Sequence, residues 1–180
     1  AANDALKKNV QAARGIAHDC KAGAVVALDV RDFSILAAAS YPGYDLEKYV
    51  NDRSYYQEIS KDSTIPLFNR AFNGSFAPGS TFKPIVAIGA LEERAMTDKD
   101  RVTCNGLYVY PGSTFTTKCL GHHGAADFKY AITKSCTVYF CEMGRRLGIK
   151  NMNLYCKKFG LGVKTGIEIS EAEGVLAGPE

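Results

Sequence analysis

Hydrophobic residues recur along the chain with periods that predict a mixture of helices and strands. Residues 1–19 place Leu6 and Val10 at helical spacing among polar residues, which is typical of an amphipathic helix. Two apolar runs follow, at 23–30 and 34–40, and a short polar link separates them. This arrangement predicts an antiparallel hairpin with at least one strand buried on both faces. The first helix would then cover this small sheet.

The later part of the chain shows mainly helical patterns. Residues 45–76 are irregular and polar, which predicts surface segments with short helical turns. Residues 80–93 are apolar on all sides and tolerate Pro84 in the first turn, so they predict a buried central helix. Four further segments are expected in chain order: a polar, glycine-rich loop over 97–124, a helix over 127–147 interrupted near Ser135, a helix over 151–159, and a loop with short extended chain to 169.

The composition is that of a globular protein and excludes several functional classes. With 46% hydrophobic and 23% charged residues, disorder is excluded. The net charge of +3 comes from scattered basic residues, so the sequence gives no nucleic-acid-binding stripe. No apolar run approaches the roughly 18 residues that span a bilayer, and the N-terminus lacks the pattern of a signal peptide. Any membrane anchor or export signal is therefore expected outside these residues.

Ser80 and Lys83 form the strongest candidate for chemistry. They are one helical turn apart, so their side chains share a face of the predicted helix. Among apolar residues a lysine is favoured in its neutral form, which can take the proton of the serine hydroxyl. The helix N-terminus also offers N–H groups to a developing negative charge. By themselves, the residues Ser-Thr-Phe-Lys at 80–83 are more typical of a serine helix cap followed by a surface lysine.

The surrounding residues favour the chemical interpretation. The run 73–84, Asn-Gly-Ser-Phe-Ala-Pro-Gly-Ser-Thr-Phe-Lys-Pro, resembles the nucleophile segment of class B penicillin-binding proteins of the PBP2-like kind. The resemblance covers almost the whole chain. It continues in the opening hairpin at 23–45, the approach to the nucleophile at 70–72, a loop at His123 and Gly124, the second family motif at 134–140, and the stretch 159–169.

The resemblance implies an α/β (α+β) fold, the transpeptidase fold that penicillin-binding proteins share with serine β-lactamases. We expect residues 1–180 to be the N-terminal part of one such domain, truncated at both ends: a helix and β-hairpin plus the helical subdomain. The family's third motif, Lys-Thr-Gly or Lys-Ser-Gly on a later strand, is absent with the C-terminal half. Residues 164–166 have its letters, but their flanks resemble an earlier family segment, so we do not interpret them as that motif.

The resemblance also implies an activity, peptidoglycan D,D-transpeptidation. In this family the matching serine, Ser80, attacks the D-Ala-D-Ala end of a stem peptide, and β-lactams are trapped on it. Lys83 would be the base, Ser135 would pass protons, and no catalytic cofactor is needed. Thr137 would bind substrate, although the family has Asn or Asp there and a threonine lacks the amide fork.

Three alternatives therefore stay open. They are a catalytically silent or sensor-type penicillin-binding domain, a D,D-carboxypeptidase, and a β-lactamase. We expect the fragment alone to be inactive. The family implies a place outside the bacterial cytoplasmic membrane, with a glycosyltransferase and other cell-wall proteins as partners and no nucleic acid. A role in elongation or in division is not distinguished.

Cysteines and a histidine form a second candidate site. Three thiols and one imidazole suit tetrahedral zinc, but their long spacings match no compact zinc finger and by themselves favour buried cysteines or a disulfide. Some elongation-type family members place zinc ligands at similar positions, which implies a structural zinc that pins the loop of Ser135. The set is Cys104, Cys119, His123 and Cys136, with a Cys104–Cys119 disulfide and His122 as the alternatives.

Overall fold

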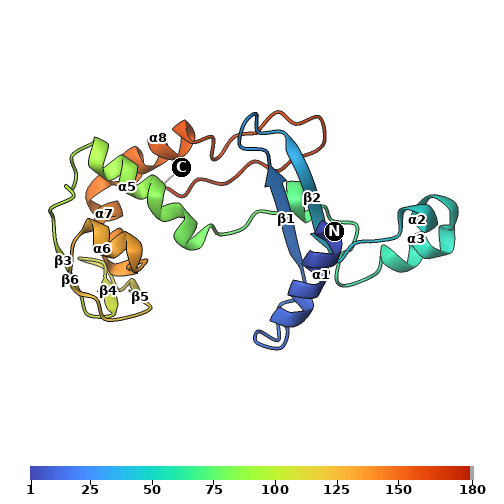
Figure 1. Cartoon of the computed structure of the whole chain (residues 1–180), viewed down its shortest axis with the longest axis horizontal. Coiled ribbons are helices and arrows are strands. Elements are labelled where there is room, and N and C mark those ends of the chain that lie inside the picture. Colours follow the sequence, from blue (N-terminus) through green and yellow to red (C-terminus); the bar gives the residue numbers. More distant parts are fainter. Residues whose placement is uncertain (179–180) are drawn as a thin grey trace. The chain divides into compact units, whose positions relative to one another are not determined.

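The computed structural model describes residues 1–178 and forms two compact units (Figure 1). Unit 1 comprises Ala1–Ser75 and Ile167–Ala172, and unit 2 comprises Phe76–Gly166 with the described residues from 173 onward. The expectation that residues 1–180 are part of one transpeptidase domain stays a prediction. Within residues 1–178, no helix is both long and apolar enough to cross a bilayer.

Unit 1 is built on the predicted hairpin. Strands β1 (Gly23–Leu28) and β2 (Ile35–Tyr41) pair in antiparallel register, and α1 (Ala2–Ala13) packs against them through the buried side chain of Val10. The hairpin is thus confirmed, whereas the first helix ends earlier than predicted. The expectation of a strand buried on both faces is wrong. β1 is largely exposed and only Ala39 of β2 is buried, because few elements of the described chain pack against the hairpin.

Short helices occupy the irregular segment of unit 1, as predicted. Helices α2 (Leu46–Asn51) and α3 (Arg53–Ile59) lie side by side, and aspartates at their N-termini accept hydrogen bonds from the first backbone N–H groups. Helix α4 (Arg70–Asn73) packs on the hairpin, where the N–H of Ala71 donates to Ser40 Oγ at 3.0 Å. This contact fixes the segment that leads to the nucleophile.

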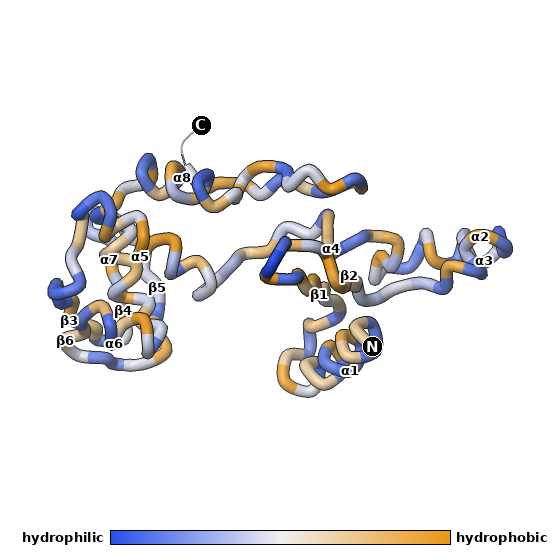
Figure 2. Tube along the Cα trace, turned by 45° about the horizontal axis from the view of Figure 1, so that its top comes forward, coloured by the Kyte–Doolittle hydropathy of each residue, from blue (hydrophilic) through white to orange (hydrophobic). Residues whose placement is uncertain are grey.

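Unit 2 is a helical cluster around α5 (Lys83–Glu92), which the hydropathy colours of Figure 2 show as mainly hydrophobic. A short 3₁₀ helix, η1 (Gly79–Phe82), precedes α5, and the cluster is completed by α6 (Phe128–Thr133), α7 (Thr137–Leu147) and α8 (Ile149–Lys158). Gly89 permits the close packing, because a Cβ there would lie 2.9 Å from Leu147 and 3.2 Å from Tyr155. The predicted helices and the break near Ser135 are confirmed.

The segment 97–124, predicted as a loop, contains four short strands. β3 (Val102–Cys104) pairs with β6 (Gly124–Ala126), and β4 (Leu107–Val109) pairs with β5 (Thr116–Lys118), both antiparallel. Strands of three residues are too short to show a period of two, which is why the polar sequence concealed them. β3, β4 and β5 pack against α7 and so lie next to the helix that follows Ser135.

Candidate active site

The nucleophile candidate lies at the entrance to the central helix of unit 2. Ser80 is exposed in η1, and Lys83 is the half-buried first residue of α5. Gly79 has a φ of +58°, a left-handed conformation that glycine adopts without a Cβ penalty. The chain therefore turns into the helix immediately before Ser80. The spacing of one turn between serine and lysine is kept although Ser80 is in a 3₁₀ turn.

Ser135 connects the two residues of this motif. Its hydroxyl donates to Ser80 Oγ at 3.0 Å, and Lys83 Nζ donates to Ser135 Oγ at 2.9 Å and to the Ser135 carbonyl at 2.5 Å. Lys83 thus reaches Ser80 through Ser135, 55 residues further along the chain from Ser80. Lys83 Nζ also lies 5.7 Å from the ring centre of Phe140, where the face of the ring favours a positive charge.

The turn that carries Ser135 is strained in a way typical of functional sites. Its φ is +51°, an uncommon conformation for a residue with a Cβ that costs on the order of 1–3 kcal/mol. The turn is held by the N–H of Cys136, which donates to the carbonyl of Ala131 at 2.8 Å, and by Lys83 on the carbonyl of Ser135. Thr137 then begins α7, and its N–H donates to Cys119 Sγ at 3.3 Å.

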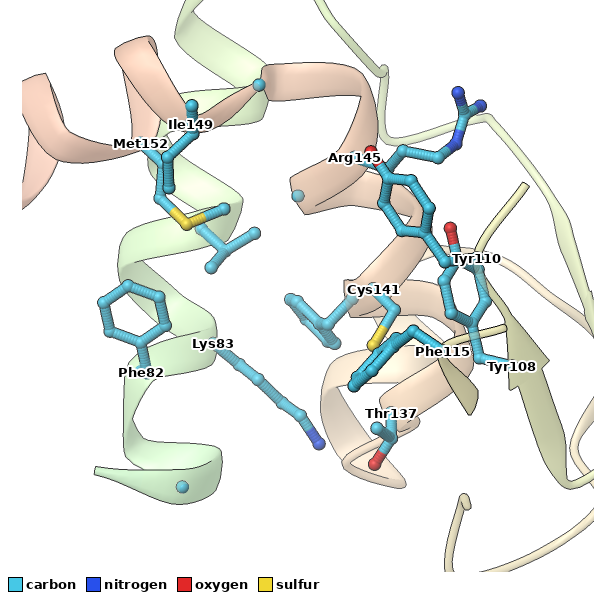
Figure 3. Close-up of a pocket in the computed structure, with 15 residues that line it drawn as sticks. Phe82, Lys83, Tyr108, Tyr110, Phe115, Thr137, Cys141, Arg145, Ile149 and Met152 are labelled. Atoms are coloured by element: carbon cyan, nitrogen blue, oxygen red, sulfur yellow. The ribbon is translucent and has the colours of Figure 1, made fainter. Parts of the chain in front are cut away.

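These contacts define what the site can do chemically. A serine hydroxyl that is hydrogen-bonded to a second hydroxyl, itself bonded to an amine, has a path along which its proton can leave. A pocket of about 430 Å³ lies beside the path and is lined by Lys83 and Thr137 among others (Figure 3). The site is therefore suited to acyl transfer onto serine. Residues 164–166 form no strand, the form in which the third motif is found.

The four metal-ligand candidates come together although they are far apart in sequence. Pairing of β3 with β6 places Cys104 beside the residue after His123, and the N–H of His123 donates to the carbonyl of Cys104 at 3.1 Å. Their ligand atoms, with those of Cys119 and Cys136, all lie within 4.8 Å of one another. The imidazole of the group is that of His123, which leaves His122 outside it. All six cysteines of the chain are free thiols.

The spacing of these atoms fits a tetrahedral ion. His123 Nδ1 lies 3.5 Å from the sulfur atoms of Cys104 and Cys119, and the sulfur atoms of Cys119 and Cys136 are 4.0 Å apart. Zinc–ligand bonds at tetrahedral angles would separate sulfur from nitrogen by about 3.6 Å and sulfur from sulfur by about 3.8 Å. The residues present therefore fit the group that the sequence suggested.

Two of these thiols have pKa values shifted in opposite directions. Burial raises the pKa of Cys136 to about 12, with smaller contributions from the neighbouring thiols Cys104 and Cys119 that raise it and a hydrogen bond from the Tyr139 backbone that lowers it. Burial would also raise the pKa of Cys119, but backbone N–H groups of 121, 138 and 137 hydrogen-bond its sulfur and lower the pKa to about 6. A bound cation would have to replace the thiol protons, because cysteine coordinates a metal as the thiolate.

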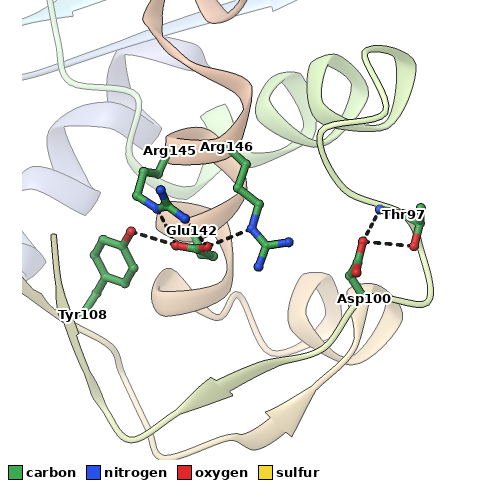
Figure 4. A network of polar contacts seen from close by, with 6 residues as sticks. All are labelled: Thr97, Asp100, Tyr108, Glu142, Arg145 and Arg146. Atoms are coloured by element: carbon green, nitrogen blue, oxygen red, sulfur yellow. Dashed lines mark hydrogen bonds and ion pairs between the residues drawn. The ribbon is translucent and has the colours of Figure 1, made fainter. Parts of the chain in front are cut away.

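A polar network that the sequence did not reveal joins β4 to α7 (Figure 4). Tyr108 of β4 is buried, and its hydroxyl donates to Glu142 Oε2 at 3.1 Å. Glu142 also accepts two hydrogen bonds from Arg145, at 2.8 and 2.7 Å, and one from Arg146 at 2.8 Å. The spacing of Glu142 and Arg146 suits a helical ion pair, but nothing in the sequence indicated Tyr108.

Glu142 is expected to make the stability of unit 2 sensitive to acid. Hydrogen bonds from Arg145 and Arg146 lower its pKa to about 2 against the effect of burial. A depressed pKa contributes stability above the unfolded value of about 4.3, and this contribution is lost as pH falls toward 2. We expect Glu142→Gln to be less stable than the parent at pH 7, with a difference in free energy of unfolding that shrinks between pH 4.3 and pH 2.

Chemical denaturation at several pH values measures this difference. Glu58→Gln, at an exposed site on α3, is the matched control and should differ little from the parent at any pH. A difference for Glu142→Gln that does not change with pH would show that the carboxylate charge has no role in the network.

With this geometry in hand, the class of the protein is clear. Residues 23–177 match the sequence pattern of the family described as the penicillin binding protein transpeptidase domain. This chain belongs to that family.

Individual relatives and solved structures are consistent with membership of this family. The chain is 39% identical over 153 residues to the peptidoglycan D,D-transpeptidase MrdA of Haemophilus influenzae, over 83% of this chain and 24% of that protein. It is similar to a penicillin G acyl-enzyme complex of penicillin-binding protein A from M. tuberculosis, with a TM-score of 0.72, 28% identity, and coverage of 84% and 38% of the two chains. It is also similar to the complex of PBP2 with MreC from Helicobacter pylori, with a TM-score of 0.77 and 26% identity. The match covers 93% of this chain and 32% of the chain in that structure.

The matches cover only part of each relative, so the activity of a whole relative is not carried over to this chain. The chain spans about a quarter of the length of the MrdA relative. The predicted family and transpeptidase fold are confirmed. The roles of individual residues stay predictions that rest on the geometry described above.

Proposed function

We propose that the protein carrying this chain is a peptidoglycan D,D-transpeptidase that forms an acyl-enzyme on Ser80. The supporting observation is the hydrogen-bonded path from Ser80 through Ser135 to Lys83, in a chain of the transpeptidase family. The relative named D,D-transpeptidase and the similar structure with penicillin G bound as an acyl-enzyme both favour this chemistry over simple binding.

The geometry supports a specific sequence of proton movements. Ser80 Oγ attacks the carbonyl carbon of the bond between the last two D-Ala residues of a stem peptide. Its proton passes to Ser135 Oγ while the hydroxyl proton of Ser135 passes to Nζ of Lys83. When the C–N bond breaks, the same hydroxyl of Ser135 returns a proton to the leaving nitrogen, and D-Ala departs. The amine of a second stem peptide then attacks the ester, which cross-links the two peptides and restores Ser80.

Thr137 has a narrower role in this proposal than the residue found there in most of the family. It lines the pocket at the start of α7, close to Lys83 (Figure 3). Its single hydroxyl can make one contact with the amide backbone of the acyl donor, where an asparagine would make two. We propose that Thr137 positions substrate in this way.

We also propose that Cys104, Cys119, His123 and Cys136 hold a structural zinc ion. The support is the spacing of their ligand atoms, which suits four-coordinate zinc with no open position for water. When bound, the ion would supply a fixed positive charge among the thiolates. Cys136 lies between Ser135 and Thr137, and Cys119 accepts the N–H of Thr137, so these ligands would hold the catalytic turn in place.

The proposed activity implies where and with what the protein works. Stem peptides are cross-linked outside the cytoplasmic membrane, so we place the active site there. The Helicobacter pylori relative was solved as a complex with MreC, and another similar structure represents a peptidoglycan synthase complex. We propose a comparable cell-wall assembly, with a glycan-polymerising partner, for this protein.

Release of D-Ala tests the proposed function. The full-length protein is incubated with a synthetic pentapeptide ending in D-Ala-D-Ala and with an acceptor peptide, and free D-Ala and cross-linked product are quantified. We expect both products from the parent and neither from Ser80→Ala, while Ser63→Ala, at an exposed serine of unit 1, retains both. D-Ala without cross-linked product would indicate a carboxypeptidase, and absence of both would contradict the proposal.

A further inference from the structure

Two exposed aromatic rings stand at the mouth of the pocket beside the catalytic path. Tyr110 and Phe115 flank the turn between β4 and β5, where the N–H of Tyr110 donates to the carbonyl of Phe115 at 3.0 Å. Tyr110 is 43% exposed and Phe115 57% exposed. Together with Lys83 and Thr137 they line the pocket, and Figure 3 shows the ring of Phe115 between Cys141 and Thr137 and the ring of Tyr110 nearer Arg145.

The pocket has the chemistry of a small-molecule subsite. Most of its wall is carbon, from side chains such as Phe82, Val86 and Phe140, and the catalytic amine of Lys83 lies at one end. Its volume of about 430 Å³ is within the range of pockets that bind small ligands. Exposed aromatic rings favour flat apolar groups, which stack against them or meet them edge to face.

The hairpin that carries these rings is held in one position. Tyr108 of β4 lies two residues before Tyr110 and lines the same pocket, and its hydroxyl donates a hydrogen bond to Glu142 of α7. Glu142 is in turn fixed by Arg145, whose side chain also borders the pocket. A wall fixed in advance loses little conformational freedom when a ligand binds, so it can select among ligands.

From these contacts we propose that the β4–β5 hairpin is a specificity-determining wall of the active site. Tyr110 and Phe115 bind a flat apolar group carried on the acyl side of an acyl donor or β-lactam while Ser80 reacts with its carbonyl. Glu142 acts as a positioning residue through Tyr108. This inference deepens the proposed function and rests on it, since it assumes that Ser80 is acylated.

The test compares two β-lactams that share a ring system. Benzylpenicillin carries a phenylacetyl group, whereas 6-aminopenicillanic acid has a bare amine at the same position. In the full-length protein, Tyr110→Ala and Phe115→Ala should each lower the second-order rate constant for acylation by benzylpenicillin about tenfold, mainly through weaker binding before the chemical step. The rate constant with 6-aminopenicillanic acid should change less than about twofold.

Two controls separate this role from a structural one. Val109→Ala changes the opposite face of the same strand, away from the pocket lining, and should leave the ratio of the two rate constants unchanged. Tyr110→Phe and Phe115→Tyr keep a ring at each position and should restore the preference for benzylpenicillin.

Three outcomes would overturn the inference. Equal losses with both β-lactams would show that the rings only support the fold of unit 2. Unchanged rates with both would show that the rings do not touch the ligand. If neither compound acylates the unsubstituted protein, the proposed function itself fails and the subsite fails with it.

Discussion

Replacement of Lys83 by methionine is expected to slow acylation of Ser80 by benzylpenicillin about 10²–10⁴-fold, the usual effect of removing a general base. Methionine keeps the length and apolar stem of lysine but has no amine to receive the proton that leaves Ser80 by way of Ser135. Stopped-flow or quenched mass spectrometry of the full-length protein measures the rate. Lys129→Met, an exposed lysine on α6, is the matched control and should acylate at the parent rate.

Ser135→Ala distinguishes a relayed proton from a direct one. Because the hydrogen bonds run from Lys83 to Ser135 and from Ser135 to Ser80, loss of the middle hydroxyl should slow acylation nearly as much as loss of the amine. The double variant should be little slower than either single variant, since the residues act as a unit. Additive losses would contradict the relay, and a Ser135→Ala rate close to that of the parent would show that Lys83 acts on Ser80 directly.

Loss of a metal ligand is the second change with a large expected effect. Cys136→Ser should abolish retention of zinc and destabilise the protein by on the order of 4 kcal/mol, because binding energy of a structural metal is folding energy. For a cooperatively folding domain of about 150–250 residues, that corresponds to a fall in melting temperature of roughly 8–16 °C. Acylation should slow as well, because Cys136 and Cys119 border the turn of Ser135 and Thr137.

Elemental analysis and differential scanning calorimetry measure these effects together. Cys20→Ser, a half-buried thiol of unit 1, is the control and should retain one zinc per chain and the parent melting temperature. Two observations together would contradict the metal site. The parent protein, purified under reducing conditions, would contain no zinc, and its melting temperature would be the same before and after dialysis against zinc. A Cys136→Ser variant that keeps its zinc would show that the ligand set is wrong.

The spacing of residues along the chain predicted the Ser80–Lys83 pair, whereas the other contacts of the site join residues that are far apart in the sequence. Ser80 and Lys83 are one turn apart, so any helical turn brings them together and the sequence alone indicated the pair. Ser135 is 55 residues from Ser80 and was recognised only by resemblance. Its hydrogen bond to Ser80 depends on the packing of α7 against α5 and α6, which no local pattern encodes.

The cysteine cluster also depends on contacts between residues that are far apart in the sequence. Cys104 and His123 meet because β3 pairs with β6, yet both strands have only three residues and were predicted as loop. Tyr108 and Glu142 were missed altogether, since the contact joins residues 34 positions apart. The antiparallel hairpin of unit 1 was predicted but its burial was not, because the hydrophobicity of a strand shows what it can bury and not what covers it.

The account depends most directly on Ser80 being the residue that becomes acylated. The decisive measurement is intact mass and peptide mapping of the full-length protein after brief exposure to benzylpenicillin. We predict a single added penicilloyl group per chain, found on the peptide that contains Ser80 and absent from Ser80→Ala. A penicilloyl group on another residue, or an adduct that persists in Ser80→Ala, would contradict the central claim.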